Sequence, residues 1–204
     1  MFAENFRRIQ SSLKVSDVQD IARRYFVMNA FDGALTMLGI VVGAYVAGMR
    51  EPAIIIAAGL SGSVAMGISG FSGAYMTEQA ERTRSLKTLE SAMLSDLSKS
   101  IHGDAGHLAA IATSLVDGLS PAVGAIFIII PFFLVRMNML NYDTAFYLSM
   151  AMAAVFLFAL GAYLSVISQE RILKNGLKML AVGVVTAVIT SAISRLVETP
   201  LPIV

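Results

Sequence analysis

The chain lacks cysteine and carries little charge. With no cysteine among its 204 residues, it can form neither a disulfide nor a thiolate–metal bond. Any metal site must therefore use oxygen, imidazole or thioether ligands. Only 14% of the residues are charged, against about 25% in soluble domains. The net charge of +1 is nearly balanced, so we expect no nucleic-acid partner.

Apolar residues are abundant, at 56% of the chain. They form blocks of 18 or more residues instead of stripes at the helical period, which indicates membrane spans and not a soluble core. Each block is close to the ~20 residues that cross ~30 Å of hydrocarbon. The sequence therefore predicts an all-α, polytopic membrane protein with five transmembrane helices, at about residues 29–49, 52–77, 118–135, 144–167 and 177–196.

Three segments lie outside these spans. Residues 1–28 predict an amphipathic helix on the cytoplasmic membrane surface, with Ser16 and Gln19 as a capping box at its start. Residues 78–117 are too long for a plain connection and rich in helix formers, and they predict a short helical cytoplasmic segment of two helices that meet at "HGDAG". Residues 29–77 hold spans one and two, residues 118–196 hold spans three to five, and 197–204 form an outer tail.

The basic residues predict the orientation of the chain. With the N-terminus inside, the cytoplasmic segments contain 12 of the 15 Lys and Arg residues. Only Arg50, Arg136 and Arg195 then lie outside. Cytoplasmic loops close to the spans retain positive charge, so we expect a multi-pass protein of the cell membrane with a cytoplasmic N-terminus.

Asp32 is the only clear carboxylate within a predicted span. An ionised Asp at the centre of a membrane helix costs ~2.5–3.5 kcal/mol on translocon scales, so such residues usually face a cavity, a partner or a transported ion. The alternative is a structural role near the inner interface, where the cost is lower. Met66 in span two has a thioether that suits Fe(II) or a similar borderline cation, although it can equally fill space in the core.

Further candidate ligands lie between spans two and three. Glu78 and Glu81 are three residues apart and share a helix face, so they are candidate metal ligands. The alternative is that they pair with the neighbouring arginines as an ordinary solvated face. His102 and His107, the only histidines, are five residues apart across two glycines, which is not a helical ligand spacing.

Small residues follow spans one and two at helical spacing. Rows of this kind let two helices touch backbone to backbone. We therefore expect spans one and two to pack closely, with Asp32 near their seam. The predicted packing residues are Gly39, Gly43, Gly59 and Gly67.

At these residues the sequence resembles the vacuolar iron transporter family. The matching stretches are "FDGALTMLGIVVGAY" in span one and "GSVAMGISGFSGAYMTEQAE" in span two. The proline-flanked span "PAVGAIFIIIPFF" and the final span "GLKMLAVGVVTAVITSAISRL" agree as well. The resemblance covers roughly residues 20–196, and the order and spacing of the motifs carry it.

The resemblance implies a dimer of five-span protomers that exchanges Fe(II), and often Mn(II), for protons. It implies that Asp32 takes the place of the family's essential aspartate. Two positions depart from the pattern, because the family's metal-binding Met falls on Gly70 and a Glu of span two falls on Gly62. Met66, one turn before Gly70, is a candidate substitute. The segment after span two is also shorter than the family's Glu-rich metal-binding domain.

We therefore expect a homodimeric transporter, and not an enzyme, that exports Fe(II) or Mn(II) from the cytoplasm in exchange for protons. The partners are divalent cations, protons and the bilayer, and no permanently bound cofactor is expected. Two alternatives stay open from the sequence, namely transport of another cation or small solute and a non-transporting membrane scaffold.

Overall fold

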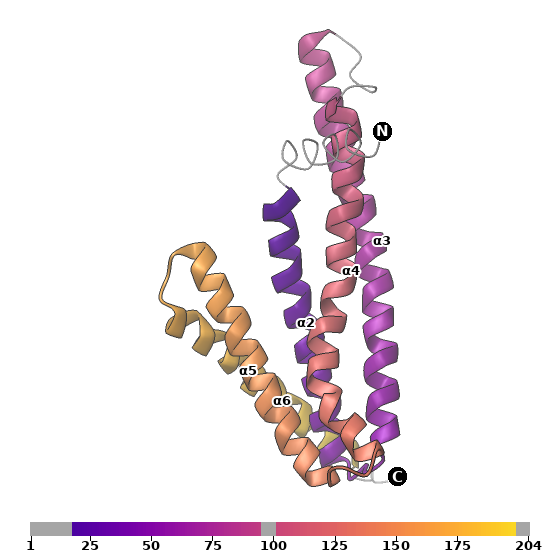
Figure 1. Ribbon diagram of the computed structural model, residues 1–204, viewed down its shortest axis with the longest axis vertical. Coiled ribbons are helices and arrows are strands. Elements are labelled where there is room, and N and C mark those ends of the chain that lie inside the picture. Colours follow the sequence, from indigo (N-terminus) through magenta and orange to yellow (C-terminus); the bar gives the residue numbers. More distant parts are fainter. Residues whose placement is uncertain (1–17, 95–100, 199–204) are drawn as a thin grey trace, which may run out of the picture. The chain divides into compact units, whose positions relative to one another are not determined.

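The computed structural model describes residues 18–94 and 101–198, with side chains omitted from the description at 101–106, and within that part of the chain it is all-helical (Figure 1). Its five helices are each long and apolar enough to cross a membrane. This confirms the predicted fold class of a polytopic membrane protein. The helices are α2 (Val18–Val46), α3 (Pro52–Met93), α4 (Ile101–Arg136), α5 (Tyr142–Ser168) and α6 (Ile172–Glu198).

The segment between spans two and three differs from the expected pair of short helices. Span two continues without a break to Met93 at the end of α3, and α4 already begins at Ile101. The stretch "HGDAG" therefore lies inside α4 and not between two helices. Glycine within a helix costs only about 1 kcal/mol relative to alanine, and the apolar residues that follow offset this cost. Both helices extend beyond the described start of α2 (Figure 1).

The amphipathic N-terminal helix is also part of a longer element. Its residues from Val18 onward belong to α2, which continues directly into span one. The proposed cap residue Ser16 lies outside the described residues, as do the rest of 1–17 and the tail from 199.

The chain divides into two compact units, and α2, α3 and α4 contribute residues to both. Of the described residues, the first unit, hereafter the polar unit, comprises 18–29, 66–94 and 101–120. The second, hereafter the apolar unit, comprises 30–65 and 121–198.

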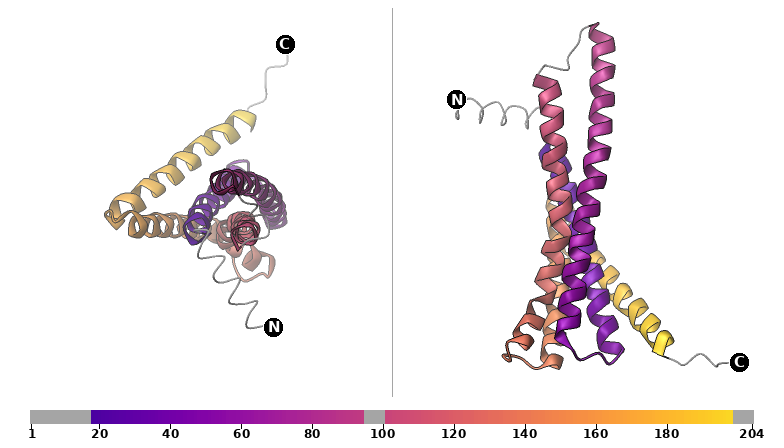
Figure 2. Two further views of the ribbon diagram at one scale, coloured as in Figure 1. Left: turned by 90° about the horizontal axis from the view of Figure 1, so that it is seen from above. Right: turned by 90° about the vertical axis from the view of Figure 1, so that its right-hand side faces the viewer.

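In the polar unit, α3 and α4 touch at their backbones. A Cβ atom on Gly67 would lie 2.8 Å from the carbonyl oxygen of Gly118, and a Cβ on Gly118 would lie 2.7 Å from the carbonyl oxygen of Gly67. These distances are shorter than any normal Cβ contact, so neither position tolerates a side chain without separation of the helices. The two helices run side by side in both side views (Figures 1 and 2).

The apolar unit contains the hydrophobic core. Side chains from α2, α3, α4 and α5 meet there, and Met37, Ile55, Ile128 and Phe132 are almost completely buried. Within α4, Pro131 removes one helical hydrogen bond. The Ser149 hydroxyl of α5 donates a hydrogen bond to the Ile128 carbonyl of α4 at 2.6 Å, which satisfies this buried hydroxyl inside the core.

Helices α5 and α6 form a hairpin whose ends meet at a tight turn (Figure 2). Gln169 ends α5 in the left-handed conformation, with φ of 55°. Just beside the turn, a Cβ on Gly161 would lie 2.5 Å from the carbonyl oxygen of Asn175, so the glycine permits the close contact. Most of α6 is exposed and apolar, which suits contact with lipid.

Candidate functional site

Asp32 lies on α2 in the apolar unit, and its side chain is exposed in the single chain. The next residue explains why the motif pairs Asp with Gly. A Cβ on Gly33 would lie 2.1 Å from the carbonyl oxygen of Pro121, so only glycine allows α2 to approach α4 here. In the Asp-Gly pair, Asp32 thus places a carboxylate on the exposed surface of α2, and Gly33 lets the same helix contact the backbone of Pro121 in α4.

Met66 and the two candidate glutamates belong to α3 in the polar unit. The Met66 side chain is half-buried, and that of Glu81 is exposed. Within the described residues, no three His, Asp or Glu side chains lie close enough to hold one metal ion.

Glu78 is held by two partners. Tyr25 of α2 donates a hydrogen bond to its Oε1 at 2.9 Å, and the Arg82 Nε lies 3.3 Å from its Oε2. The Arg82 and Glu78 side chains are only 17% and 12% exposed, so this ion pair is more shielded from water than an ordinary surface pair. From the sequence, Glu78 was either a metal ligand or the partner of a neighbouring arginine, and the contact with Arg82 corresponds to the second alternative.

The same cluster leaves part of the arginine unsatisfied. The Nε and Nη2 atoms of Arg82 are buried without a hydrogen-bond partner among the described residues. A guanidinium in this position depends on the Glu78 carboxylate for compensation, because removing one member of a shielded pair leaves the other charge uncompensated. Glu78 is thus part of the structure of the polar unit whether or not it also binds a cation.

Of the two histidines, His107 has a described side chain. The His107 ring packs edge-on against Tyr75, with 6.3 Å between ring centroids. The side chain of His102 lies outside the described residues.

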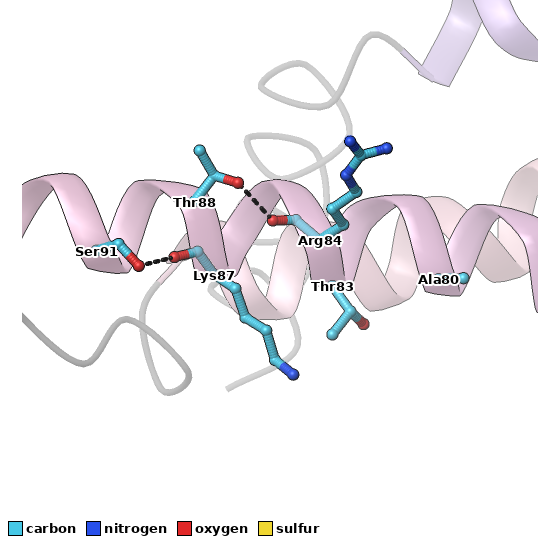
Figure 3. Close-up of a pocket in the computed structure, with 6 residues that line it drawn as sticks. All are labelled: Ala80, Thr83, Arg84, Lys87, Thr88 and Ser91. Carbon is cyan, nitrogen blue, oxygen red and sulfur yellow. Dashed lines mark hydrogen bonds between the residues drawn. The ribbon is translucent and has the colours of Figure 1, made fainter.

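A shallow hollow occurs farther along α3, within the extension beyond span two (Figure 3). The Thr88 hydroxyl there donates to the Arg84 carbonyl at 3.0 Å, and the Ser91 hydroxyl donates to the Lys87 carbonyl at 2.9 Å. Among the described residues, the charged side chains that line it are two cations, so this lining does not suit a metal ion. Its lining residues are Ala80, Thr83, Arg84, Lys87, Thr88 and Ser91.

Sequence reasoning missed Asp117. The apolar pattern places Asp117 in the cytoplasmic segment and predicts Asp32 as the only clear carboxylate within a span. The candidate span in α4 in fact begins at His107, and Asp117 within it is only 6% exposed. A predicted third span that begins about ten residues earlier in the sequence includes Asp117.

Two other helices surround this carboxylate. The Asn29 amide of α2 donates hydrogen bonds to Asp117 Oδ1 and to the Tyr25 carbonyl oxygen, the latter at 2.9 Å. On α3, a Cβ at Gly70 would lie 2.7 Å from Asp117 Oδ2. Gly70 is the position at which the resemblance places the family's metal-binding Met, and here a carboxylate from α4 occupies the adjacent space.

The predicted packing glycines lie at helix contacts, but not all with the expected partner. Cβ atoms on Gly39 and Gly43 would meet Thr190 and Ser194 of α6, each at 3.3 Å. The row in span one therefore faces span five, contrary to the expected contact with span two. Spans one and two do meet at Gly59, where a Cβ would lie 2.6 Å from the Met37 sulfur.

The comparisons with known proteins identify the family of the chain. The VIT family pattern matches residues 87–195. An uncharacterized protein of Methanocaldococcus jannaschii is 33% identical over 175 residues, which cover 84% of this chain and 88% of that protein. No solved structure matches. With five membrane-spanning helices and a family match over more than half of its length, the chain belongs to the VIT family, a family of membrane metal-ion transporters.

Proposed function

We propose that this chain exports Fe(II) or Mn(II) from the cytoplasm in exchange for protons, as a homodimer in the cell membrane. Membership of the VIT family supports metal-ion transport. The choice of ion, the proton coupling and the direction are the proposal, and they rest on the family resemblance and on the charge distribution of the loops.

The exposed position of Asp32 is the observation that carries the proposal. An ionised carboxylate facing lipid in the middle of a bilayer is costly, so intramembrane carboxylates usually face a water-filled path or another protein surface. Asp32 is exposed in the single chain although it lies in an apolar helix. A second copy that covers this face of α2 would remove the carboxylate from lipid and enclose a path for the cation.

Transport by the purified protein in liposomes tests the function. Protein-dependent uptake of Fe(II) and Mn(II), accelerated by an opposing proton gradient, is the expected result. Asp32→Asn should abolish it while the protein stays folded. Asp20→Asn, which removes an exposed carboxylate of the same helix, is the matched control and should transport normally.

The outcomes separate the proposal from its alternatives. A scaffold would transport no cation at all, and a transporter of another cargo would move neither Fe(II) nor Mn(II). Wild-type flux in Asp32→Asn would exclude Asp32 from the site. Met66→Leu should impair Fe(II) more than Mn(II), because a thioether favours the softer ion; equal loss of both ions would remove Met66 as a ligand.

The orientation is tested separately by labelling, which the absence of native cysteine makes straightforward. Arg84→Cys and Lys174→Cys should be protected from impermeant thiol reagents in intact cells. Met139→Cys, in the turn between α4 and α5, should react. The reverse pattern would place the N-terminus outside.

A further inference from the structure

Asp117 is the one carboxylate in the buried class among the described side chains. It lies in α4 between Asn29 of α2 and Gly70 of α3, all within the polar unit. Ionisable residues inside membrane spans are costly and usually serve a function. The transport path proposed above uses Asp32 and does not account for this second carboxylate.

The three residues share one depth along their helices. Asn29 lies 17 residues before Val46 at the end of α2, Gly70 lies 18 residues after Pro52, and Asp117 lies 19 residues before Arg136. At 1.5 Å per residue these separations correspond to about 26–29 Å, close to the ~30 Å thickness of the hydrocarbon. Asp117 therefore lies about one span length from Arg136 along α4, within the candidate span that begins at His107.

Glycine creates the space for the carboxylate. Any side chain at Gly70 would displace Asp117 Oδ2, since its Cβ would lie only 2.7 Å away. Gly73, one turn farther on the same helix, has nothing within 4 Å of its Cβ position. The need for glycine at position 70 is thus specific to the carboxylate and not a general property of this part of α3.

The donor atoms indicate the type of ligand. A carboxylate supplies two oxygens, and an asparagine amide supplies an oxygen as well as the N–H groups that now bind Asp117 and the Tyr25 carbonyl. Small hard divalent cations keep several waters and bind through one or two carboxylates, so this set is sufficient for a weak site. Weak binding is what a conduction path requires, because the ion must also leave.

We propose that Asp117 and Asn29 form a transient binding site for a partly hydrated, oxygen-preferring divalent cation such as Mn(II). The cation binds Asp117 and displaces the Asn29 N–H, and rotation of the amide then presents its oxygen to the ion. This site rests on the proposed transport function for its role, but it is distinct from Asp32 and is tested first by binding.

Binding of Mn(II) to the full-length protein in detergent micelles, followed by the electron paramagnetic resonance signal of free Mn(II), tests the site. Asp117→Asn keeps the shape of the side chain and removes its charge. It should raise the Kd for Mn(II) about tenfold or more. The same variant in liposomes should raise the KM for Mn(II) by a similar factor, with kcat less affected.

A glycine pair provides the control and keeps the test decisive if Asp117→Asn does not fold. Gly70→Ala should weaken Mn(II) binding because its methyl group displaces the carboxylate, whereas Gly73→Ala should bind as the wild type does. Unchanged Kd in Asp117→Asn, or equal effects of the two glycine variants, would overturn the site.

Comparison with Asp32→Asn separates this inference from the proposed function. If Asp32→Asn abolishes flux while Asp117→Asn and Gly70→Ala keep wild-type Kd and KM, the transport function stands and the second site fails. If the wild type neither binds nor transports Mn(II), the proposed function fails for this ion and the site fails with it.

Discussion

The two units of the chain differ in what they bury. The apolar unit encloses Met37, Ile128, Phe132 and similar side chains, and its ion pair between Arg50 and Asp143 is exposed. The polar unit encloses the Asp117 carboxylate and shields the pair of Glu78 and Arg82. Buried charge adds little to stability and is often retained for other reasons. We infer that the packing of the apolar unit supplies most of the stability, and that the polar unit holds the shielded charges. Asp32 is the candidate ligand that lies in the apolar unit, where it is exposed.

The largest effect on stability should follow a cavity in the apolar unit. Phe132 has no exposed surface, and Phe→Ala in a protein core costs about 3–5 kcal/mol. We expect Phe132→Ala to cost about 3 kcal/mol, because lipid already provides an apolar environment and the loss is mainly one of packing. Unfolding in mixed micelles measures it. If Phe132→Ala lowered the free energy of unfolding by less than Tyr25→Phe does, the apolar unit would not be the main source of stability.

Gly33→Ala should have the next largest effect. Its Cβ would meet the backbone of Pro121 at 2.1 Å, and backbone cannot rotate away as a side chain can, so we expect a loss of about 1–3 kcal/mol. Gly62→Ala is the matched control, since nothing lies within 4 Å of that position. It should equal or exceed the wild type, as alanine favours helix by about 1 kcal/mol. Equal stability of the two variants would refute the close approach.

A smaller effect is expected in the polar unit from loss of the Tyr25 hydroxyl. Tyr25→Phe removes the hydrogen bond to Glu78, which corresponds to about 0.5–1.5 kcal/mol. A double-mutant cycle with Glu78→Gln isolates the coupling between the two side chains. Coupling indistinguishable from zero would mean that the contact does not contribute to stability.

The smallest effect should come from the exposed ion pair of the apolar unit. The Arg50 guanidinium pairs with Asp143 and lies over the Tyr45 ring at 4.5 Å. The side-chain hydrogen bond with Tyr45 is the largest factor that raises the pKa of Arg50, so the residue stays charged at every working pH. Water and salt screen such pairs. Asp143→Asn should therefore melt within a few degrees of the wild type, and the difference should vanish at high salt; a large, salt-independent loss would contradict this.

The sequence alone was sufficient for the number and approximate position of the spans. Length and continuous apolarity are properties of each segment by itself, and the bilayer requires every span to satisfy its own backbone as a helix. Asp32 and its neighbouring glycine were visible for the same reason, because a carboxylate within a long apolar run needs no structural context to be noticed.

Only the tertiary structure decided which residues meet. The burial of Asp117 depends on Asn29 and Gly70 from two other helices, and no local pattern in α4 encodes that contact. The same holds for the glycine row of span one, which faces α6, because small-residue spacing predicts that a helix packs closely but not which helix it packs against. Whether a segment spans the membrane depends on the free energy of transferring that one segment into lipid. Which residues form a site depends on distances between segments that are far apart in the chain.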